Sequence, residues 1–156
     1  MSQRPLPTTP EGWHRFFAVE TNNLAWSLSE ACTQGVPKPE LLDAAHASAW
    51  HWHAVGADEN RMRSVMLLAL VHARFNLGSS AWQYAEHMRD FFLARSETPD
   101  WELTLVHTIH ALAARAHGNA IAFEDSRSKA ERAFKSVQDP IDREIVDRTY
   151  RLLGTT

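Results

Sequence analysis

Apolar side chains recur every three or four positions along most of the chain, which is the spacing of one face of an α-helix. The first such stripe starts near Glu11 and ends at the segment Gly35 to Pro39. It contains Trp13, Phe16, Phe17, Leu24 and Leu28. Residues 1–10 hold three prolines and show no periodicity. We therefore expect a flexible lead-in segment over 1–10, followed by a single helical domain over 11–154.

Six further stripes follow, and each is bounded by residues that start or stop helices. Prolines and acidic residues stand at the expected starts, where they suit the first turn, and glycines stand at several expected ends. The predicted helices run from Pro39 to about Gly56, from Asp58 to about Phe75, from Gly78 to about Phe92, from Thr98 to Gly118, from Ile121 to Val137, and from Asp139 toward Leu153. No segment alternates with a period of two. The sequence therefore predicts about seven helices and no sheet.

Two of the predicted turns stand at a regular interval. Gly78 joins the third and fourth helices and Gly118 the fifth and sixth, so the turns are 118 − 78 = 40 residues apart. Helix pairs that recur at such a period usually stack, each covering the apolar face of its neighbour. We therefore expect an all-α stack of antiparallel helix hairpins.

Short motifs occur in a fixed order between about residues 14 and 147. They include Ala18-Val-Glu20, Asn22-Asn23, Trp26, Ala44-Ala-His-Ala-Ser48, His51-Trp52, Val55-Gly56, Asn60, Arg63, Val71-His-Ala73, Asp100-Trp-Glu-Leu103 and Gly118-Asn119. Together they resemble a family of uncharacterised bacterial proteins that are similar to tetratricopeptide repeats. The resemblance implies the fold and the order of the helices, and it implies no enzymatic activity for this chain. The turn Asn76–Trp82 departs from the family's usual Gly-x-Gly-Glu-Pro-Ala-Leu.

Composition narrows the function classes. The chain has 156 residues with 16 Lys and Arg against 19 Asp and Glu, a formal net charge of −3. Neither half forms a basic cluster, so we expect no nucleic-acid partner. No window approaches the about 18 apolar residues of a membrane span, and the first residues lack a secretion signal, so we expect no membrane partner. A lone Cys32 fits a reducing compartment, which points to the cytoplasm.

Histidine and tryptophan concentrate in the second predicted helix, which contains His46-Ala-Ser-Ala-Trp-His-Trp-His53. One interpretation is structural: Trp52 and one histidine pack in the core with bonded nitrogens, while His53 is solvated. The other is a ligand-binding pocket formed by His46, His51, Asn23, Glu20 and Trp52. The helical period separates these rings onto several faces, so they cannot all point the same way.

His107 and His110 are one turn apart on the fifth predicted helix, a spacing that suits two metal ligands. A third imidazole would have to come from His46 or His72. This alternative describes a metal-dependent enzyme with His46, His107 and His110 between helices. The chain contains no His-Glu-x-x-His motif and no pair of Glu-x-x-His motifs, and a hydrogen-bonded core histidine at 110 or a solvated one at 107 explains the spacing without a metal. We therefore predict no cofactor.

The remaining chemistry favours binding over catalysis. Cys32 has no histidine near it in the sequence, the glycines form no phosphate loop, and no nucleophile elbow occurs. The arginines from Arg127 to Arg151 alternate with acids and are typical of a solvated face. We expect a binding or scaffolding module, with no enzymatic activity, that holds a protein or peptide partner or a second copy of itself. Exposed rings at Trp13, Trp82 and Trp101 are the candidate contacts, and a histidine-based pH sensor is a further hypothesis.

Overall fold

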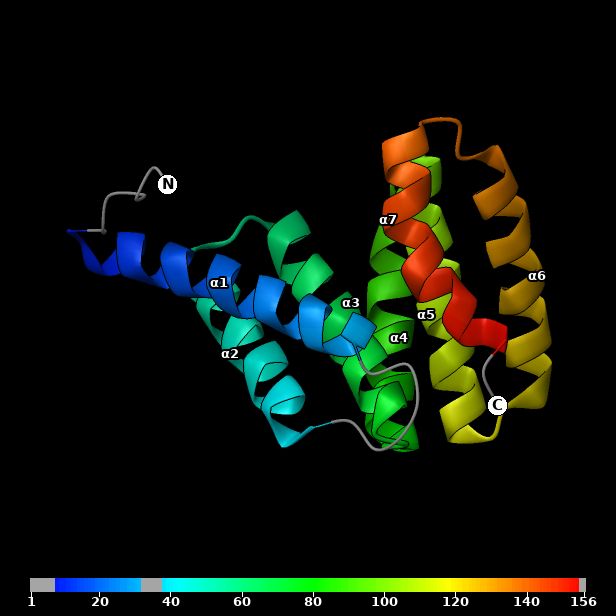
Figure 1. Ribbon diagram of the computed structural model, residues 1–156, viewed down its shortest axis with the longest axis horizontal. Helices are drawn as coiled ribbons and strands as arrows, with labels where there is room; N and C mark the ends of the chain where they lie inside the picture. The colour runs from blue at the N-terminus through cyan, green and yellow to red at the C-terminus, as the bar shows by residue number, and fades with distance from the viewer. Residues whose placement is uncertain (1–7, 32–37, 155–156) are drawn as a thin grey trace.

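The computed structural model describes residues 8–31 and 38–154, and in those ranges every regular element is a helix (Figure 1). The elements are α1 (Pro10–Ala31), α2 (Pro39–Val55), α3 (Asp58–Arg74), α4 (Gly78–Ala94), α5 (Asp100–His117), α6 (Ala120–Ser136), α7 (Pro140–Tyr150) and a short 3-10 helix η1 (Arg151–Gly154). The prediction of seven α-helices and no strand is confirmed for this part of the chain. Cys32 and residues 1–7 of the predicted lead-in segment lie outside the described residues.

Consecutive helices pack as pairs. The contacting pairs are α1 with α2, α3 with α4, and α5 with α6, and these hairpins are joined by contacts of α2 with α3 and α4 with α5. In Figure 1 the α1–α2 pair lies at one end of the molecule, α3 and α4 lie in the middle, and α5 and α6 lie at the other end. The last helix, α7, packs on α5. The predicted stack of helix hairpins agrees with this arrangement, while the single-domain boundary at residue 11 stays a prediction.

Local signals placed several helix ends correctly. Asp139 caps α7 through its side chain, which accepts hydrogen bonds from Ile141 N at 2.8 Å and Asp142 N at 3.0 Å. Asn119 caps α6 in the same way. Gly118 ends α5 with φ 80°, a left-handed conformation that costs a residue with a Cβ atom about 1 kcal/mol. These short connections orient α5, α6 and α7 relative to one another.

One predicted start needs correction. The fifth helix starts at Asp100, not at Thr98, and Pro99 occupies its N-cap position. The Thr98 hydroxyl donates to Phe92 O at 2.7 Å. The predicted start of α4 at Gly78 is confirmed, and the N-cap residue of α4 makes no side-chain cap.

The interior contains two groups of buried apolar side chains. The larger lies among α3, α4, α5 and α7 and contains Leu70, Ala81, Phe92, Ile109 and Val146, among others. The smaller lies among α1, α2 and α3 and contains Ala25, Leu41, Ala45, Leu67 and Val71. The alanines allow close approach of the helices, as the small side chains in the sequence indicated. Trp26 packs against both groups and thus lies where the two meet.

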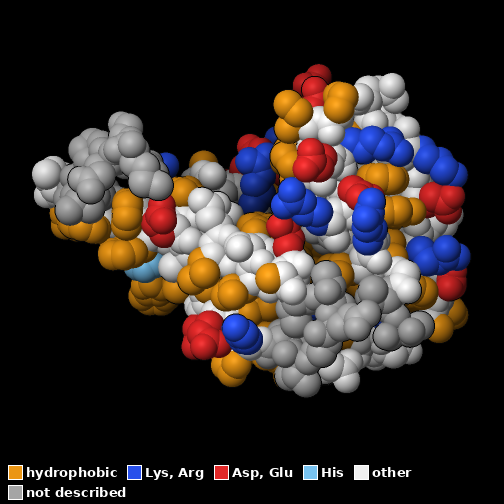
Figure 2. Space-filling model, in the orientation of Figure 1, with side chains coloured by type: hydrophobic (Ala, Val, Ile, Leu, Met, Phe, Trp, Pro, Cys, Tyr) orange, Lys and Arg blue, Asp and Glu red, His pale blue; other side chains and the backbone are white. Residues whose placement is uncertain are grey.

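The surface carries charges of both signs. On the face of α6 and α7, Lys and Arg side chains alternate with Asp and Glu, as Figure 2 shows. Several of these charges form ion pairs one helical turn apart, such as Arg127 with Glu124 at 2.8 Å and Lys129 with Asp125 at 2.7 Å. Across residues 8–31 and 38–154, no helix has the length and apolar character needed to cross a membrane.

Candidate binding cavity among α1, α3, α5 and α7

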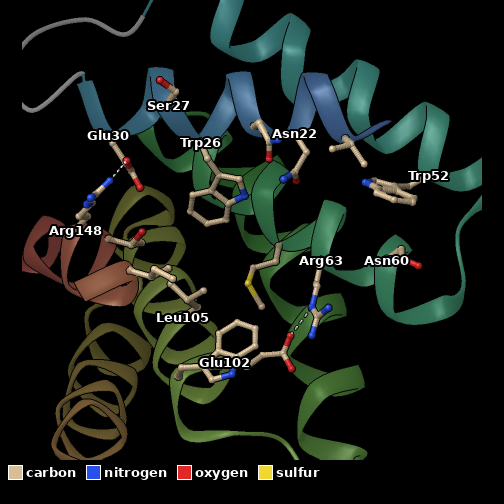
Figure 3. Close-up of a pocket in the computed structure, with 16 residues that line it drawn as sticks. Asn22, Trp26, Ser27, Glu30, Trp52, Asn60, Arg63, Glu102, Leu105 and Arg148 are labelled. Atoms are coloured by element: carbon tan, nitrogen blue, oxygen red, sulfur yellow. Dashed lines mark hydrogen bonds and ion pairs between the residues drawn. The ribbon is translucent and has the colours of Figure 1, made fainter. Parts of the chain in front are cut away.

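An open cavity of about 610 Å³ lies where the α1–α2 pair meets α5 and α7 (Figure 3). Its walls come from α1, α3, α5 and α7, with Trp52 as the contribution of α2. Met66 and Leu105 form part of its apolar lining. Pockets that hold small molecules or short segments are commonly about 300–1,000 Å³ and combine apolar walls with a few polar groups. The size and lining of the cavity fall within the range that such pockets show.

Three indole rings from three different helices line the cavity. Trp26 belongs to α1, Trp52 to α2 and Trp101 to α5. All three are half-buried, and none of their Nε1–H groups donates a hydrogen bond within the described ranges. An indole N–H that is open to the cavity can donate to a bound group. The three indoles therefore offer both flat apolar surface and unused donors.

Three asparagines add amide groups to the same wall. The amides of Asn22 and Asn23, on α1, make no hydrogen bond to another described residue. Asn60 lies in the first turn of α3, and its Oδ1 accepts from Ala57 N at 3.2 Å, while its amide nitrogen makes no hydrogen bond to a described residue. An amide can donate and accept at once. The asparagines therefore extend the hydrogen-bonding capacity of the cavity without adding charge.

A buried ion pair lies at the α3–α5 side of the cavity, as Figure 3 shows. Arg63 Nε donates to Glu102 Oε1 at 2.8 Å, and the guanidinium also pairs with Glu59 at 2.6 Å. The Glu102 side chain is only 1% exposed, and its second oxygen, Oε2, accepts no hydrogen bond from the described residues. The nearest paired cation to Oε2 is Arg95 Nη1 at 3.7 Å. One buried acceptor at the cavity is therefore unused.

The opposite side of the cavity is bounded by a second ion pair. Arg148 Nη1 of α7 lies 3.0 Å from Glu30 Oε2 in the last turn of α1 (Figure 3). The carboxylate of Glu30 raises the pKa of Arg148. The sequence placed Arg148 on a solvated face. It is exposed on one side, but it also lines the cavity and connects two helices that are far apart in the chain.

The structure divides the five residues of the predicted pocket. Asn23 and Trp52 line the cavity, whereas Glu20, His46 and His51 do not. His46 Nε2 lies 3.0 Å from His72 Nε2, and His51 Nδ1 lies 2.9 Å from His14 Nδ1. The five residues are therefore not all brought to one cavity, because the helical period places the two imidazoles on other faces of α2 than Trp52.

These two histidine pairs connect neighbouring helices. Each pair needs one ring to donate and the other to accept, so at least one ring of each pair is neutral. Burial, together with the partner ring, lowers the pKa of His72 beside His46 and that of His51 beside His14. The pairs join α2 to α3 and α1 to α2, and their evident role is to hold the helices together.

The three histidines of the alternative metal site are not assembled. His46 pairs with His72, while His110 contacts residues of α4 and α6. Within residues 8–31 and 38–154, no three or more His, Cys, Asp or Glu side chains form a group that could hold a metal ion. The pair at His107 and His110 is explained by the core: burial lowers the pKa of His107 to about 4, and burial also lowers that of His110.

His110 is fully buried and has a partner for each ring nitrogen. With the proton on Nε2, it donates to Glu86 Oε1 at 2.7 Å, and the Ser126 hydroxyl donates to Nδ1 at 2.7 Å. Arg89 pairs with the same Glu86 oxygen at 3.1 Å. A serine, histidine and acid in series can activate a nucleophile, but Ser126 is only 1% exposed and a substrate cannot reach it. The series is a structural link among α4, α5 and α6.

The predicted exposed tryptophans also need correction. Trp13, Trp82 and Trp101 are all half-buried: Trp13 stacks on Phe17, Trp82 packs against His110 and His117, and Trp101 lines the cavity. The exposed indole is Trp50, which is 71% accessible on the outer face of α2.

Comparison of the chain with protein-family models, with curated proteins and with solved structures found no match.

Proposed function

We propose that this chain is a binding module that holds a segment of a partner protein in the cavity among α1, α3, α5 and α7. The observation that carries the proposal is the set of half-buried indoles, Trp26, Trp52 and Trp101, whose N–H groups have no acceptor among the described residues. Aromatic side chains of this kind supply most of the affinity in many protein interfaces. The cavity is open, so a segment of chain can enter it without unfolding the module.

The charged groups of the cavity support binding rather than a reaction. Arg63 is paired with Glu102 and Arg148 is paired with Glu30. Each cation is thus held by a carboxylate, which fixes both side chains but leaves neither poised to exchange a proton with a substrate. Their effect is to shape the two sides of the cavity.

The stacked hairpins give a second line of support. Helix-hairpin repeats commonly bind partners through surfaces formed by several repeats. The resemblance to tetratricopeptide-like proteins favours the same use of the fold. Several of the motifs that carry this resemblance, Asn22-Asn23, His51-Trp52 and Asp100–Leu103, supply lining residues of the cavity.

A direct test measures tryptophan fluorescence while a collection of blocked peptides of varied composition is titrated into the protein. Peptides that enter the cavity are expected to change the emission, because three indoles line it. The same peptides should lose most of their affinity for a Trp101→Ala variant and should still bind a Trp50→Ala variant, since Trp50 lies outside the cavity and is exposed. If no peptide binds, or if binders are lost equally in both variants, the proposal is wrong.

A further inference from the structure

We infer that the cavity recognises a proline-rich segment in the polyproline II conformation. This inference rests on the proposed function, because it names the class of segment that the same cavity would hold. It is carried by three properties of the lining: the excess of unused donors, the balance of charge, and the presence of indoles on three separate helices.

The unused polar groups of the cavity are mainly donors. Trp26, Trp52 and Trp101 each have a free N–H and cannot accept, and the amide nitrogen of Asn60 is a further unused donor. The amides of Asn22 and Asn23 can do either. A ligand that fits this lining must therefore present more acceptors than donors. Proline-rich backbone does so, since each proline has a carbonyl and no N–H.

The charges of the cavity favour an uncharged ligand. Arg63 and Arg95 face Glu59 and Glu102 on one side, and Arg148 faces Glu30 on the other. Both groups already contain opposite charges in contact. An additional cation or anion would lose its hydration without gaining an unpaired counter-charge. Prolines and carbonyl groups enter such a site without this cost.

The indoles offer the kinds of contact that a polyproline II helix makes. This helix has three residues per turn, no internal hydrogen bonds, and carbonyl groups that are fully available. Aromatic-lined grooves bind it by packing proline rings against aromatic faces while N–H groups bond to the carbonyls. Trp26, Trp52 and Trp101 supply both kinds of contact from three directions. The segment is also stiff before it binds, which reduces the entropy lost on binding.

The test uses two acetylated and amidated heptapeptides, titrated calorimetrically into the protein. The first has seven prolines, and the second has glycine and serine in their place. We expect the first to bind at least about tenfold more tightly than the second, which is a difference of about 1.4 kcal/mol.

Two variants show whether the indoles donate. Trp101→Phe retains a ring but loses the N–H, and it should weaken the proline peptide several-fold, whereas Trp50→Phe on the outer face of α2 should not change it. Thermal melts of both variants establish that they are folded. The inference is overturned if the glycine-serine peptide binds as tightly as the proline peptide. In that case a different binder from the peptide collection, lost in Trp101→Ala, would leave the proposed function standing, and the lack of any binder would end both.

Discussion

The guanidinium of Arg148 and the carboxylate of Glu30 meet at 3.0 Å, although 118 positions of sequence separate them. The contact joins the end of α1 to α7, and both residues line the cavity. It links the first and the last long helices at the edge of the candidate site. Most of the other surface ion pairs of the molecule lie within one helix, three or four residues apart.

Replacing Glu30 with glutamine is expected to change the stability of the fold only slightly. The Arg148 side chain is 56% exposed, and such ion pairs are weakened by water and by salt. The urea midpoint should stay close to that of the parent protein. Glu144→Gln, which removes the other carboxylate near Arg148 at 3.4 Å, is the matched control. A large drop in the midpoint for Glu30→Gln alone would show that the α1–α7 contact carries more of the fold than its exposure indicates.

Removal of the Ser126 hydroxyl is expected to destabilise the protein by about 1–3 kcal/mol, because His110 Nδ1 would become a buried nitrogen without a partner. Ser126→Ala tests this by urea unfolding. Ser79→Ala is the control, since Ser79 is exposed in the first turn of α4 and should change the stability by less than about 0.5 kcal/mol. Equal effects of the two substitutions would contradict the bonded role of Ser126.

Acid is expected to destabilise the fold through its histidines. The pKa values of His51, His72 and His110 are lowered by burial, and that of His107 is lowered to about 4. Below the usual pKa of about 6.5, the unfolded chain binds protons that the folded chain does not, so the unfolding free energy falls with falling pH. The melting temperature should be nearly constant from pH 8 to about pH 7 and should fall steadily toward about pH 4.

The contribution of His107 to the pH dependence of stability can be measured with a substitution. His107→Gln cannot take up the proton, so its melting temperature should fall less between about pH 6.5 and pH 4 than that of the parent protein. Replacement of the exposed His53 provides the comparison on α2. An unchanged profile for His107→Gln would show that the folded chain protonates this ring as readily as the unfolded chain does.

Two glycines at hairpin turns are expected to respond differently to alanine. A Cβ atom at Gly78 would lie 2.3 Å from Ala116 O, so α4 and α5 would have to separate, at a cost of about 1–3 kcal/mol or more. A Cβ atom at Gly118 has nothing within 4 Å, and its cost comes only from the φ of 80°, about 1 kcal/mol. Urea unfolding of Gly78→Ala and Gly118→Ala should therefore rank the first as the less stable. The reverse order would contradict the close approach at Gly78.

The sequence predicted the helices better than the site, for physical reasons. Helix ends depend on local groups such as Asp139 and Gly118, whose spacing can be read directly. The cavity depends on how helices cross: Arg63 and Glu102 are 39 positions apart, and nothing in their local pattern indicates that they meet.

The crossing of helices also explains why the sequence did not show where the imidazoles of α2 would lie. The sequence showed that His46, His51 and Trp52 cannot share one face of a helix, but it did not show which face would meet the cavity. The motifs Asn22-Asn23, His51-Trp52 and Asp100–Leu103 were the available signal for the cavity, since residues from all three line it.

The walls of the cavity come from helices near both ends of the chain, α1 and α7 among them. A fragment that lacks either α1 or α7 therefore lacks part of the wall, and a nascent chain cannot complete the site until α7 has docked. Any ligand that binds only the completed site will also stabilise the docking of α1 and α7, in proportion to the logarithm of its free concentration. Occupancy and assembly of this protein are thus thermodynamically coupled.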